Sequence, residues 1–312
     1  MPWPLIRLLP RVFHVDFVRL APFAAVVSAL LVLGSIGSFV AQGLNFGIDF
    51  VGGTAIEVRT KGPVPLGELR AAVPAAGGHD AQVQGFGRPD TAIVRFRTEG
   101  NAFTAAEQVK QKLAVRFPGM EFKPPVVVGP KVSGELMSGG FMALGIALAL
   151  MLAYIWFRFQ LQFGLGAVAA VFHDIVLTLG LLSITQIEFS MTSIAALLTV
   201  IGYSMNEKVI TFDRLRENLR KYKTTPLRDV INKSENERLS RTLITGSTAI
   251  LALAGAMFLG GPVLFPLVST MVFGIVIGTY SSVYVALPII LLWGVKRNDD
   301  PAEPLKPAAV RP

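Results

Sequence analysis

Two acidic residues lie within long apolar stretches of the sequence, where an ionised side chain is costly. Asp174, which follows His173, is the one charged residue between positions 159 and 187, and Glu207 directly follows an uncharged run over 189–206. Ionisable groups inside a membrane-spanning helix cost about 2.5–3.5 kcal/mol each and commonly mark functional sites. We therefore expect each carboxyl to load and release a proton, and the alternative for Asp174 is a structural carboxylate that is hydrogen-bonded to a neighbouring helix.

Helical spacing indicates where these side chains point. Asp174 shares a stripe of small residues, which let a neighbouring helix approach, with Gly166, Ala170 and Thr178. Glu207 has a polar surrounding formed by Tyr203, Ser204, Asn206 and Thr211. Lys208 lies about 100° further round the helix, so we expect it to extend to the membrane boundary rather than to pair with Glu207. The alternative for Glu207 is an interfacial salt bridge.

The last apolar run, from 242 to 295, adds a candidate cation and a packing motif. Arg241 precedes this run, and its guanidinium stays charged, so it can hold a carboxylate ionised or repel a proton. The alternative for Arg241 is an ordinary positive flank. Gly274, Gly278 and Ser282 recur at every fourth position, which predicts a close-packing seam against a helix of this chain or of another subunit.

The composition places these residues in a membrane protein. Of the 312 residues, 52% are hydrophobic and 16% are charged, whereas soluble domains carry about 25% charged residues. A spanning helix needs about 20 apolar residues, and the 54-residue run from 242 to 295 must fold back at Gly260-Gly261-Pro262. The sequence thus predicts a mostly α-helical membrane protein with six transmembrane helices, at 21–41, 138–157, 162–184, 190–212, 240–260 and 266–293.

The distribution of Lys and Arg predicts the orientation. Segments 1–20, 213–239 and 294–312 hold 3, 8 and 4 of these residues, whereas the short loops 185–189 and 260–265 hold none. By the positive-inside rule both termini lie in the cytoplasm. We expect a cytoplasmic N-terminus and first helix in 1–41, a periplasmic domain in 42–137, five further helices in 138–293 with a cytoplasmic loop at 213–239, and a disordered cytoplasmic tail at 294–312.

The predicted periplasmic domain has the pattern of an α+β fold. Alternating segments typical of strands are Ala55–Arg59, Ala81–Phe86, Thr91–Arg97 and Glu121–Val128. Helices are predicted at Leu66–Val73 and Ala102–Arg116, and a tight hairpin turn at Gly87-Arg88-Pro89-Asp90. The order β-α-β-β-α-β is the ferredoxin-like arrangement. Its open sheet face or edge suits a partner or an extended peptide, and the alternative is a rigid spacer without a ligand.

Motifs that the sequence lacks exclude several classes of function. Because there is no Cys, the chain has no disulfide, zinc–thiolate site, iron–sulfur cluster or cysteine nucleophile. The patterns GxxxxGK[ST], HExxH and GxSxG are absent, so we expect neither an ATPase nor another enzyme. We expect no cofactor, no metal and no nucleic-acid partner.

Several motifs between about residues 14 and 293 resemble, in order, the SecD/SecF family of protein-export membrane proteins, and its SecF half in particular. They are Gly47-Ile48-Asp49-Phe50-Val51-Gly52-Gly53-Thr54, His173-Asp174, Gly202-Tyr203-Ser204-Met205-Asn206, Phe212-Asp213-Arg214-Leu215-Arg216-Glu217-Asn218, Arg241-Thr242-Leu243-Ile244-Thr245, Gly260-Gly261-Pro262-Val263 and Gly278-Thr279-Tyr280-Ser281-Ser282.

The resemblance implies one half of an RND-type (resistance–nodulation–division) transporter in the bacterial inner membrane, surrounded by membrane lipid. It implies SecD as the partner half, and a joint action on the SecYEG channel in which the proton motive force helps to pull an exported unfolded polypeptide outward. The family's proton path is placed at positions that here are Glu207 and Arg241. The family normally has Asp and a small polar residue where this chain has Glu207 and Lys208.

Two other functions stay open from the sequence. One is an RND-type half that transports a small molecule or a lipid, and the other is a non-transporting assembly factor that holds SecD and the channel together. Sodium in place of protons is a variant of the main hypothesis, with oxygen ligands from Tyr203, Ser204, Asn206 and Glu207.

Overall fold

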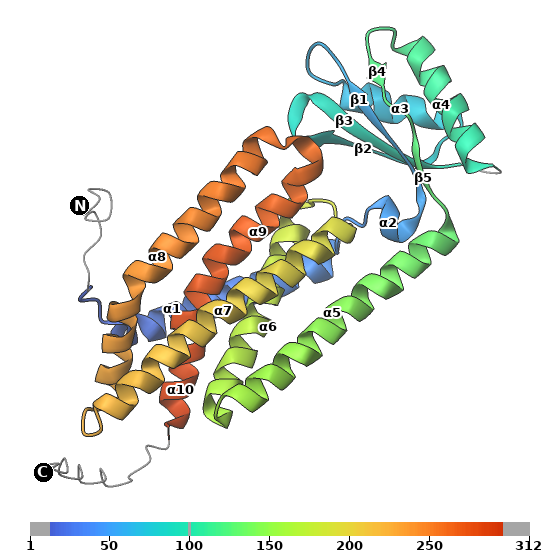
Figure 1. Ribbon diagram of the computed structural model, residues 1–312. Helices are drawn as coiled ribbons and strands as arrows, with labels where there is room; N and C mark the ends of the chain where they lie inside the picture. The colour runs from blue at the N-terminus through green and yellow to red at the C-terminus, as the bar shows by residue number, and fades with distance from the viewer. Residues whose placement is uncertain (1–12, 99–100, 296–312) are drawn as a thin grey trace, which may run out of the picture.

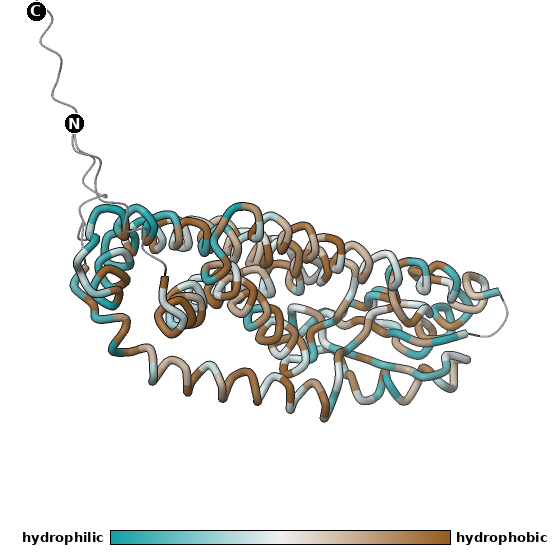
Figure 2. Tube along the Cα trace, turned by 90° about the horizontal axis from the view of Figure 1, so that it is seen from below, coloured by the Kyte–Doolittle hydropathy of each residue, from teal (hydrophilic) through white to brown (hydrophobic). Residues whose placement is uncertain are grey.

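The computed structural model describes residues 13–98 and 101–295, and for 261–263 only the backbone. It is a bundle of long helices with a small α+β domain at one end (Figure 1). Apolar residues fill the middle of the bundle, and polar residues gather at its far end and in the α+β domain (Figure 2). Nearly all of the predicted tail at 294–312 lies outside the described residues.

The bundle consists of six long helical segments in the described part of the chain. They are α1 (Phe17–Gln42), α5 (Pro130–Arg158), α6 (Leu161–Thr185), α7 (Met191–Lys221), α8 (Leu227–Leu259), and α9 (Gly261–Ser281), which continues through a π-helical stretch, η2 (Ser282–Ala286), into α10 (Leu287–Trp293). Among the described residues, 5 of these segments are long and apolar enough to cross a membrane, and α7 is the exception. Its buried charges and its polar C-terminal third lower its hydropathy, so the predicted number of six spans is not confirmed by this criterion.

The predicted cytoplasmic loop at 213–239 is mostly helical, which corrects the expectation of a loop. Helix α7 continues to Lys221 and α8 already begins at Leu227, so only 222–226 connects them. Although this hairpin is rich in charge, its inner face is apolar, with Leu215, Val230 and Ile231 buried against Phe212. An Asn218 to Ser234 hydrogen bond of 3.0 Å ties the two helices together at this end.

Helix α1 begins earlier than predicted because Asp16 caps it. Asp16 Oδ1 accepts hydrogen bonds from the backbone N–H of Arg19 at 2.9 Å and from the Asn232 amide of α8 at 2.8 Å. These two donors hold the pKa of the Asp16 carboxyl below its usual value. The chain before the cap is also attached to α8, because the Asn236 amide bonds both the N–H and the carbonyl of Val15 at 2.8 Å.

The α+β domain is a five-stranded sheet with two helices on one face (Figure 1). A short helix, α2 (Ile48–Val51), leads into β1 (Gly53–Arg59), α3 (Leu66–Ala76), β2 (His79–Phe86), β3 (Arg88–Arg97), α4 (Ala102–Arg116), β4 (Glu121–Phe122) and β5 (Val126–Val128). The strands are antiparallel in the order β2-β3-β1-β4, and β5 also pairs with β1. Alternate strand residues such as Ile56, Val58 and Val94 pack against Leu69 of α3 and Val109 of α4.

Two local predictions for this domain are wrong. The predicted strand Glu121–Val128 is broken into β4 and β5, because Pro124 and Pro125 have no N–H to donate to a ladder. The predicted four-residue turn is reduced to Gly87, at φ +73°, and residues 88–90 belong to β3. The carbonyls of Pro89 and Asp90 accept hydrogen bonds from the loop after β1, which extends this strand.

The glycine seam of α9 packs against α7 of the same chain. A Cβ on Gly274 would lie 2.6 Å from Val200 Cγ1, and one on Gly278 would lie 3.2 Å from Ser204 Cα. The small residues therefore bring α7 and α9 into close contact, and this face is not free for another subunit.

Replacing Gly274 by alanine is expected to destabilise the bundle by about 1–3 kcal/mol, because the added methyl overlaps Val200 and the packed helices must separate. Thermal unfolding in detergent would measure this loss. Gly255→Ala is the matched control, since that helical glycine has open space around it and alanine favours a helix. Equal unfolding temperatures for the two variants would contradict the seam.

Candidate functional site

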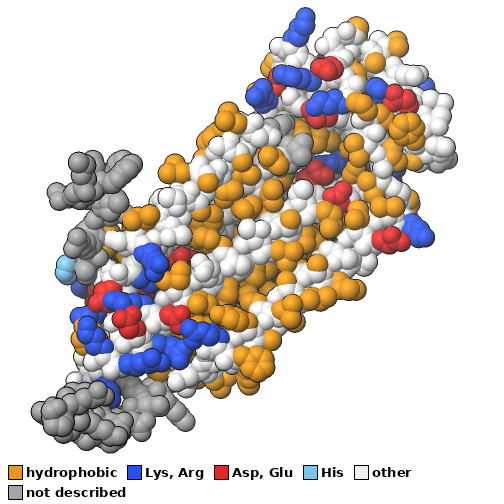
Figure 3. Space-filling model, in the orientation of Figure 1, with side chains coloured by type: hydrophobic (Ala, Val, Ile, Leu, Met, Phe, Trp, Pro, Cys, Tyr) orange, Lys and Arg blue, Asp and Glu red, His pale blue; other side chains and the backbone are white. Residues whose placement is uncertain are grey.

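Five charged side chains meet inside the bundle, where α6, α7, α8 and the α9–η2 junction come together. All of them are at most 4% exposed, although each carries an ionisable group: Asp174, Glu207, Lys208, Glu235 and Arg238. In Figure 3 the other charged side chains gather near the two ends of the molecule, and the middle of the visible face is apolar or uncharged. The five buried charges form two groups that differ in how completely they are paired.

The first group is built around the Asp174 carboxylate of α6. Lys208 Nζ of α7 donates to Asp174 Oδ2 at 2.9 Å, and the Ser281 hydroxyl of α9 donates to the same oxygen at 2.8 Å. The Ser204 hydroxyl of α7 also donates to this oxygen, and His173 Nδ1 lies 3.1 Å from Oδ1. The carboxylate is thus supplied with partners from three helices.

The second group joins α7 to α8 through one arginine. Arg238 Nη1 donates to Glu207 Oε2 at 3.2 Å, and Arg238 Nε donates to Glu235 Oε1 at 2.8 Å, with Nη2 2.6 Å from Glu235 Oε2. The Thr242 hydroxyl donates to Glu207 Oε2 at 3.2 Å, and Arg238 Nη2 donates to the Ser282 hydroxyl at 3.0 Å. Ser282, predicted as a packing residue, is therefore also a partner of the arginine.

The two groups together carry an excess of negative charge. Three carboxylates, Asp174, Glu207 and Glu235, stand against two cations, Lys208 and Arg238, so the fully ionised cluster has a net charge of −1. Glu235 engages Arg238 with both oxygens, but within the described residues nothing donates a hydrogen bond to Glu207 Oε1. A buried carboxylate oxygen in this position is a place where a proton, or a small cation, would neutralise the cluster.

Two more buried polar atoms beside the cluster lack a hydrogen-bond partner in the part of the chain that the structure describes. They are the Tyr203 hydroxyl, one helical turn before Glu207, and His173 Nε2. The His173 ring lies against the Tyr280 ring, with 6.1 Å between centroids. Buried polar groups in proteins are normally hydrogen-bonded, so these two atoms and Glu207 Oε1 mark where the polar network of the cluster is incomplete within the described residues.

Arg238 also borders a pocket of about 440 Å³ at the end of the bundle away from the sheet. The pocket is lined by Ile210, Asp213, Arg214, Glu217, Glu237, Arg238 and Arg241. Because Arg238 contacts Glu207 on one side and this pocket on the other, it connects the buried acid to a polar opening.

The sequence-predicted site residues are only partly brought together. Asp174 and Glu207 are buried and face neighbouring helices, as their spacing predicts. The expectation that Lys208 extends to the membrane boundary is wrong, because its ammonium is fully buried on Asp174. Arg241 and Asn206 are exposed, and Arg238 occupies the place beside Glu207 that Arg241 was expected to take.

Arg238 and Glu235 were missed because both lie in the segment that was assigned to a charged loop. Their spacing of three residues, followed by Thr242 four residues on, is the helical signal that would have found them. In the described residues, no group of three or more His, Cys, Asp or Glu side chains could hold a metal ion.

Comparisons with family profiles and with known proteins agree on one family. The family profile described as "Protein export membrane protein SecD/SecF, C-terminal" matches residues 108–296, and the "SecD/SecF GG Motif" matches residues 37–64. The chain is 43% identical over 304 residues to the protein translocase subunit SecF of Cereibacter sphaeroides, with 94% of each chain covered. It is 43% identical over 286 residues to the subunit of the same name from Magnetococcus marinus, with 89% of this chain and 92% of the relative covered.

The fold also matches solved structures of a longer protein. SecDF, a translocon-associated membrane protein from Thermus thermophilus, superposes with a TM-score of 0.80 at 32% identity over 94% of this chain. A structure of SecDF in a super-membrane-facing form gives a TM-score of 0.66 at 30% identity over 94% of this chain. This chain spans only 40% of the length of SecDF.

Proposed function

Because the chain belongs to the SecD/SecF family of protein-export membrane proteins, we propose that it uses the proton motive force, together with SecD, to promote the export of secretory proteins through SecYEG. The chain is a multi-pass membrane protein and an accessory subunit of the Sec protein translocase. The proposal adds the energy source, the channel and the residues that take up the proton.

We place both termini of the chain in the cytoplasm and the α+β domain in the periplasm. The high Lys and Arg content of 213–239 supports this orientation, since basic loops stay on the cytoplasmic side. We count α7 as a sixth crossing, because its Glu207 and Lys208 are buried against other helices rather than turned towards lipid. The element order and antiparallel strand order of the periplasmic domain support a ferredoxin-like assignment.

The observation that carries the proposal is Glu207 Oε1, which has no hydrogen-bond partner in the described part of the chain and lies in a cluster of net charge −1. When Glu207 is ionised, it shares Arg238 with Glu235 and holds α8 against α7. A proton on Glu207 removes this attraction and makes the cluster neutral, so that α7 and α8 can take a second arrangement. One charge that crosses about 100 mV releases about 2.3 kcal/mol, which is enough to bias such a two-state element.

We assign Asp174 to the same relay as a second acid, since its partner Lys208 adjoins Glu207 in sequence and lies within electrostatic reach of both Glu207 and Arg238. Arg241 stays a proposed member of the relay. It lines the pocket that Arg238 borders, and its exposed position would let it act on charges of the partner half.

Membrane vesicles that contain SecYEG, SecD and this chain test the proposed function. Completion of export after ATP is exhausted is expected to fall to the level without this chain when a proton ionophore is added, and to be unaffected by a sodium ionophore. Export that needs the chain but ignores both ionophores would replace the proposal with an assembly factor. Sensitivity to the sodium ionophore alone would make sodium the coupling ion.

A further inference from the structure

The five residues between α6 and α7 lie where the periplasmic sheet meets the helix bundle. This connector, 186–190, joins the helix that carries Asp174 to the helix that carries Glu207 and Lys208. A change in the angle between those two helices at this end of the bundle therefore also moves the connector. The connector is also bonded on two sides to the part of the chain that leads into the periplasmic domain and to the sheet itself.

One side of the connector is bonded to the segment between α1 and β1. The Phe189 N–H donates to the Asn45 carbonyl at 2.7 Å, and the Gly47 N–H donates back to the Phe189 carbonyl at 2.9 Å. The Met191 N–H at the start of α7 donates to Asp49 Oδ2 at 3.0 Å. These bonds make the connector and the entry to β1 a single paired unit.

The other side of the connector meets the sheet through an ion pair. Arg95 of β3 pairs with Glu188, and their side chains are only 9% and 20% exposed. Beside this pair, the Gln84 amide of β2 and the Asn45 amide both donate to the Gln186 carbonyl, at 3.2 and 2.8 Å. The ion pair is the charged contact here, and the amides surround it with neutral hydrogen bonds.

The backbone next to Glu188 is tied to the first turn of α7. The Glu188 carbonyl accepts a hydrogen bond from the Ser193 hydroxyl at 2.9 Å, and Ser190 and Ser193 form a capping box at the start of that helix. The Glu188 side chain lies directly against Gly47, where any Cβ would overlap its carboxylate. Because of these contacts, we expect a movement of α7 to move Glu188 as well.

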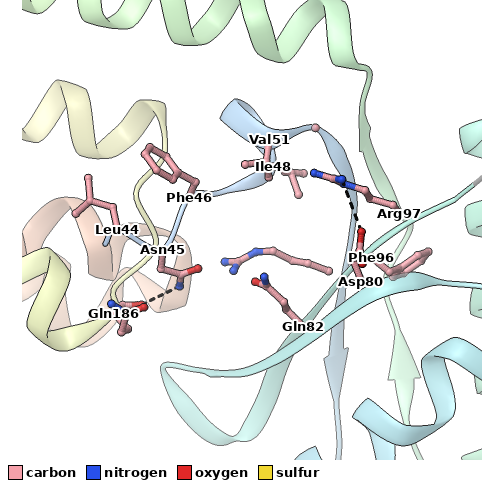
Figure 4. Close-up of a pocket in the computed structure, with 12 residues that line it drawn as sticks. Leu44, Asn45, Phe46, Ile48, Val51, Asp80, Gln82, Phe96, Arg97 and Gln186 are labelled. Atoms are coloured by element: carbon pink, nitrogen blue, oxygen red, sulfur yellow. Dashed lines mark hydrogen bonds and ion pairs between the residues drawn. The ribbon is translucent and has the colours of Figure 1, made fainter. Parts of the chain in front are cut away.

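A cavity of about 550 Å³ lies beside this contact, between β2 and β3 on one side and the connector and residues 44–52 on the other. Figure 4 shows Asn45 and Gln186 on the bundle side and Asp80, Gln82 and Arg97 on the sheet side, facing one another across it. The contact with the connector, through Gln84 of β2 and Arg95 of β3, and the cavity beside it thus lie along the same two strands, and the ion pair is where the bundle holds this part of the sheet.

We propose that the Arg95–Glu188 ion pair is the positioning link through which the proton-driven change between α6 and α7 moves the periplasmic domain. The connector and the sheet move as one body, and the pair stays closed throughout the cycle. The inference rests on the proposed function, because it requires a proton-driven change at Glu207.

Breaking the pair tests the link. With SecD and SecYEG present, Glu188→Gln is expected to lower proton-driven export by about fivefold or more, at the low end of couplings between distant sites. The protonation of Glu207, read from the infrared carboxyl band that is absent in Glu207→Gln, is expected to titrate as in the unchanged protein. Arg97→Gln is the matched control, because it removes an exposed ion pair two residues along the same strand and is expected to leave export unchanged.

Locking the pair tests the claim that it stays closed. The chain has no cysteine, so Arg95→Cys/Glu188→Cys introduces one thiol pair at this contact. Because Arg and Glu side chains together reach further than a disulfide, which needs Cα atoms within about 7 Å, the two thiols are joined by a short bis-maleimide. We expect weak export before cross-linking and recovered export after it. Full export by Glu188→Gln, or export that stops on cross-linking, would overturn the link. Loss of the ionophore effect in the unchanged protein would instead overturn the proposed function.

Discussion

Replacing Glu207 by glutamine is expected to abolish proton-driven export while the chain still assembles with SecD. Glutamine keeps the size of the side chain and removes the charge that a proton would neutralise. Arg238 retains Glu235, which it already holds through 2 hydrogen bonds from Nε, so the helix hairpin should stay folded. The measurement is export from vesicles after ATP is exhausted, with and without a proton ionophore, and we expect the variant to show no ionophore-sensitive part.

Two further variants decide what a loss at Glu207 means. Glu207→Asp restores an acid, and the residue usual in the family, but shortens the reach to Arg238, whose Nη1 lies 3.2 Å from Glu207 Oε2. We expect it to retain ionophore-sensitive export at a reduced level. Asn206→Ala changes the adjacent exposed residue and is expected to export normally. Unchanged export by Glu207→Gln would remove this carboxyl from the mechanism.

The buried acids could be found from the sequence because each stands out against an apolar run. Asp174 and Glu207 needed no knowledge of tertiary structure, since local hydropathy alone makes them exceptional. Their counterions could not be found in this way. Lys208 reaches Asp174 across the contact between α6 and α7, where the Ser204 and Ser281 hydroxyls also accept hydrogen bonds from its ammonium. This contact joins residues 34 positions apart in the sequence.

Arg238 shows a second limit, which arises when basic residues are used only to predict which segments of the chain are cytoplasmic. A basic residue in a segment with 8 Lys and Arg looks like one more cytoplasmic charge. Once α8 is known to begin at Leu227, Arg238 falls on the same inner face as Glu235 and Thr242, and its role follows from geometry. The error thus came from where the helix begins, which is the least predictable feature of a helix.

In the α+β domain the alternation of side chains predicted the type and order of the elements except for the break between β4 and β5, whereas the contacts between this domain and the helix bundle were not predictable. The break at Pro124 and Pro125 follows because proline has no backbone N–H to donate to a neighbouring strand. These two prolines are therefore the sequence signal that could have predicted the break. The pairing of Arg95 with Glu188 joins residues 93 positions apart. Nothing in either local segment distinguishes this arginine from others in β3.

The single substitutions Asp174→Asn and Lys208→Met are each expected to destabilise the bundle by about 3–5 kcal/mol, because each leaves one buried charge without its partner. Both side chains are at most 1% exposed, so water cannot take the place of the missing group. The double variant Asp174→Asn/Lys208→Met removes both charges and is expected to recover most of the loss. Unfolding in detergent, followed for all four proteins as a double-mutant cycle, measures the coupling.

The stable double variant then separates a structural role of the pair from a role in the relay. Its folded bundle would keep Glu207, Arg238 and Glu235, so export should be normal if Asp174 and Lys208 only hold helices together. We expect instead that it assembles with SecD but loses ionophore-sensitive export, because the Lys208 charge beside Glu207 and the Asp174 acid are both needed to carry the proton onward. Normal export from this variant would confine the relay to Glu207 and its arginine. A double variant that unfolds like the single variants would show that the ion pair is not what stabilises this crossing.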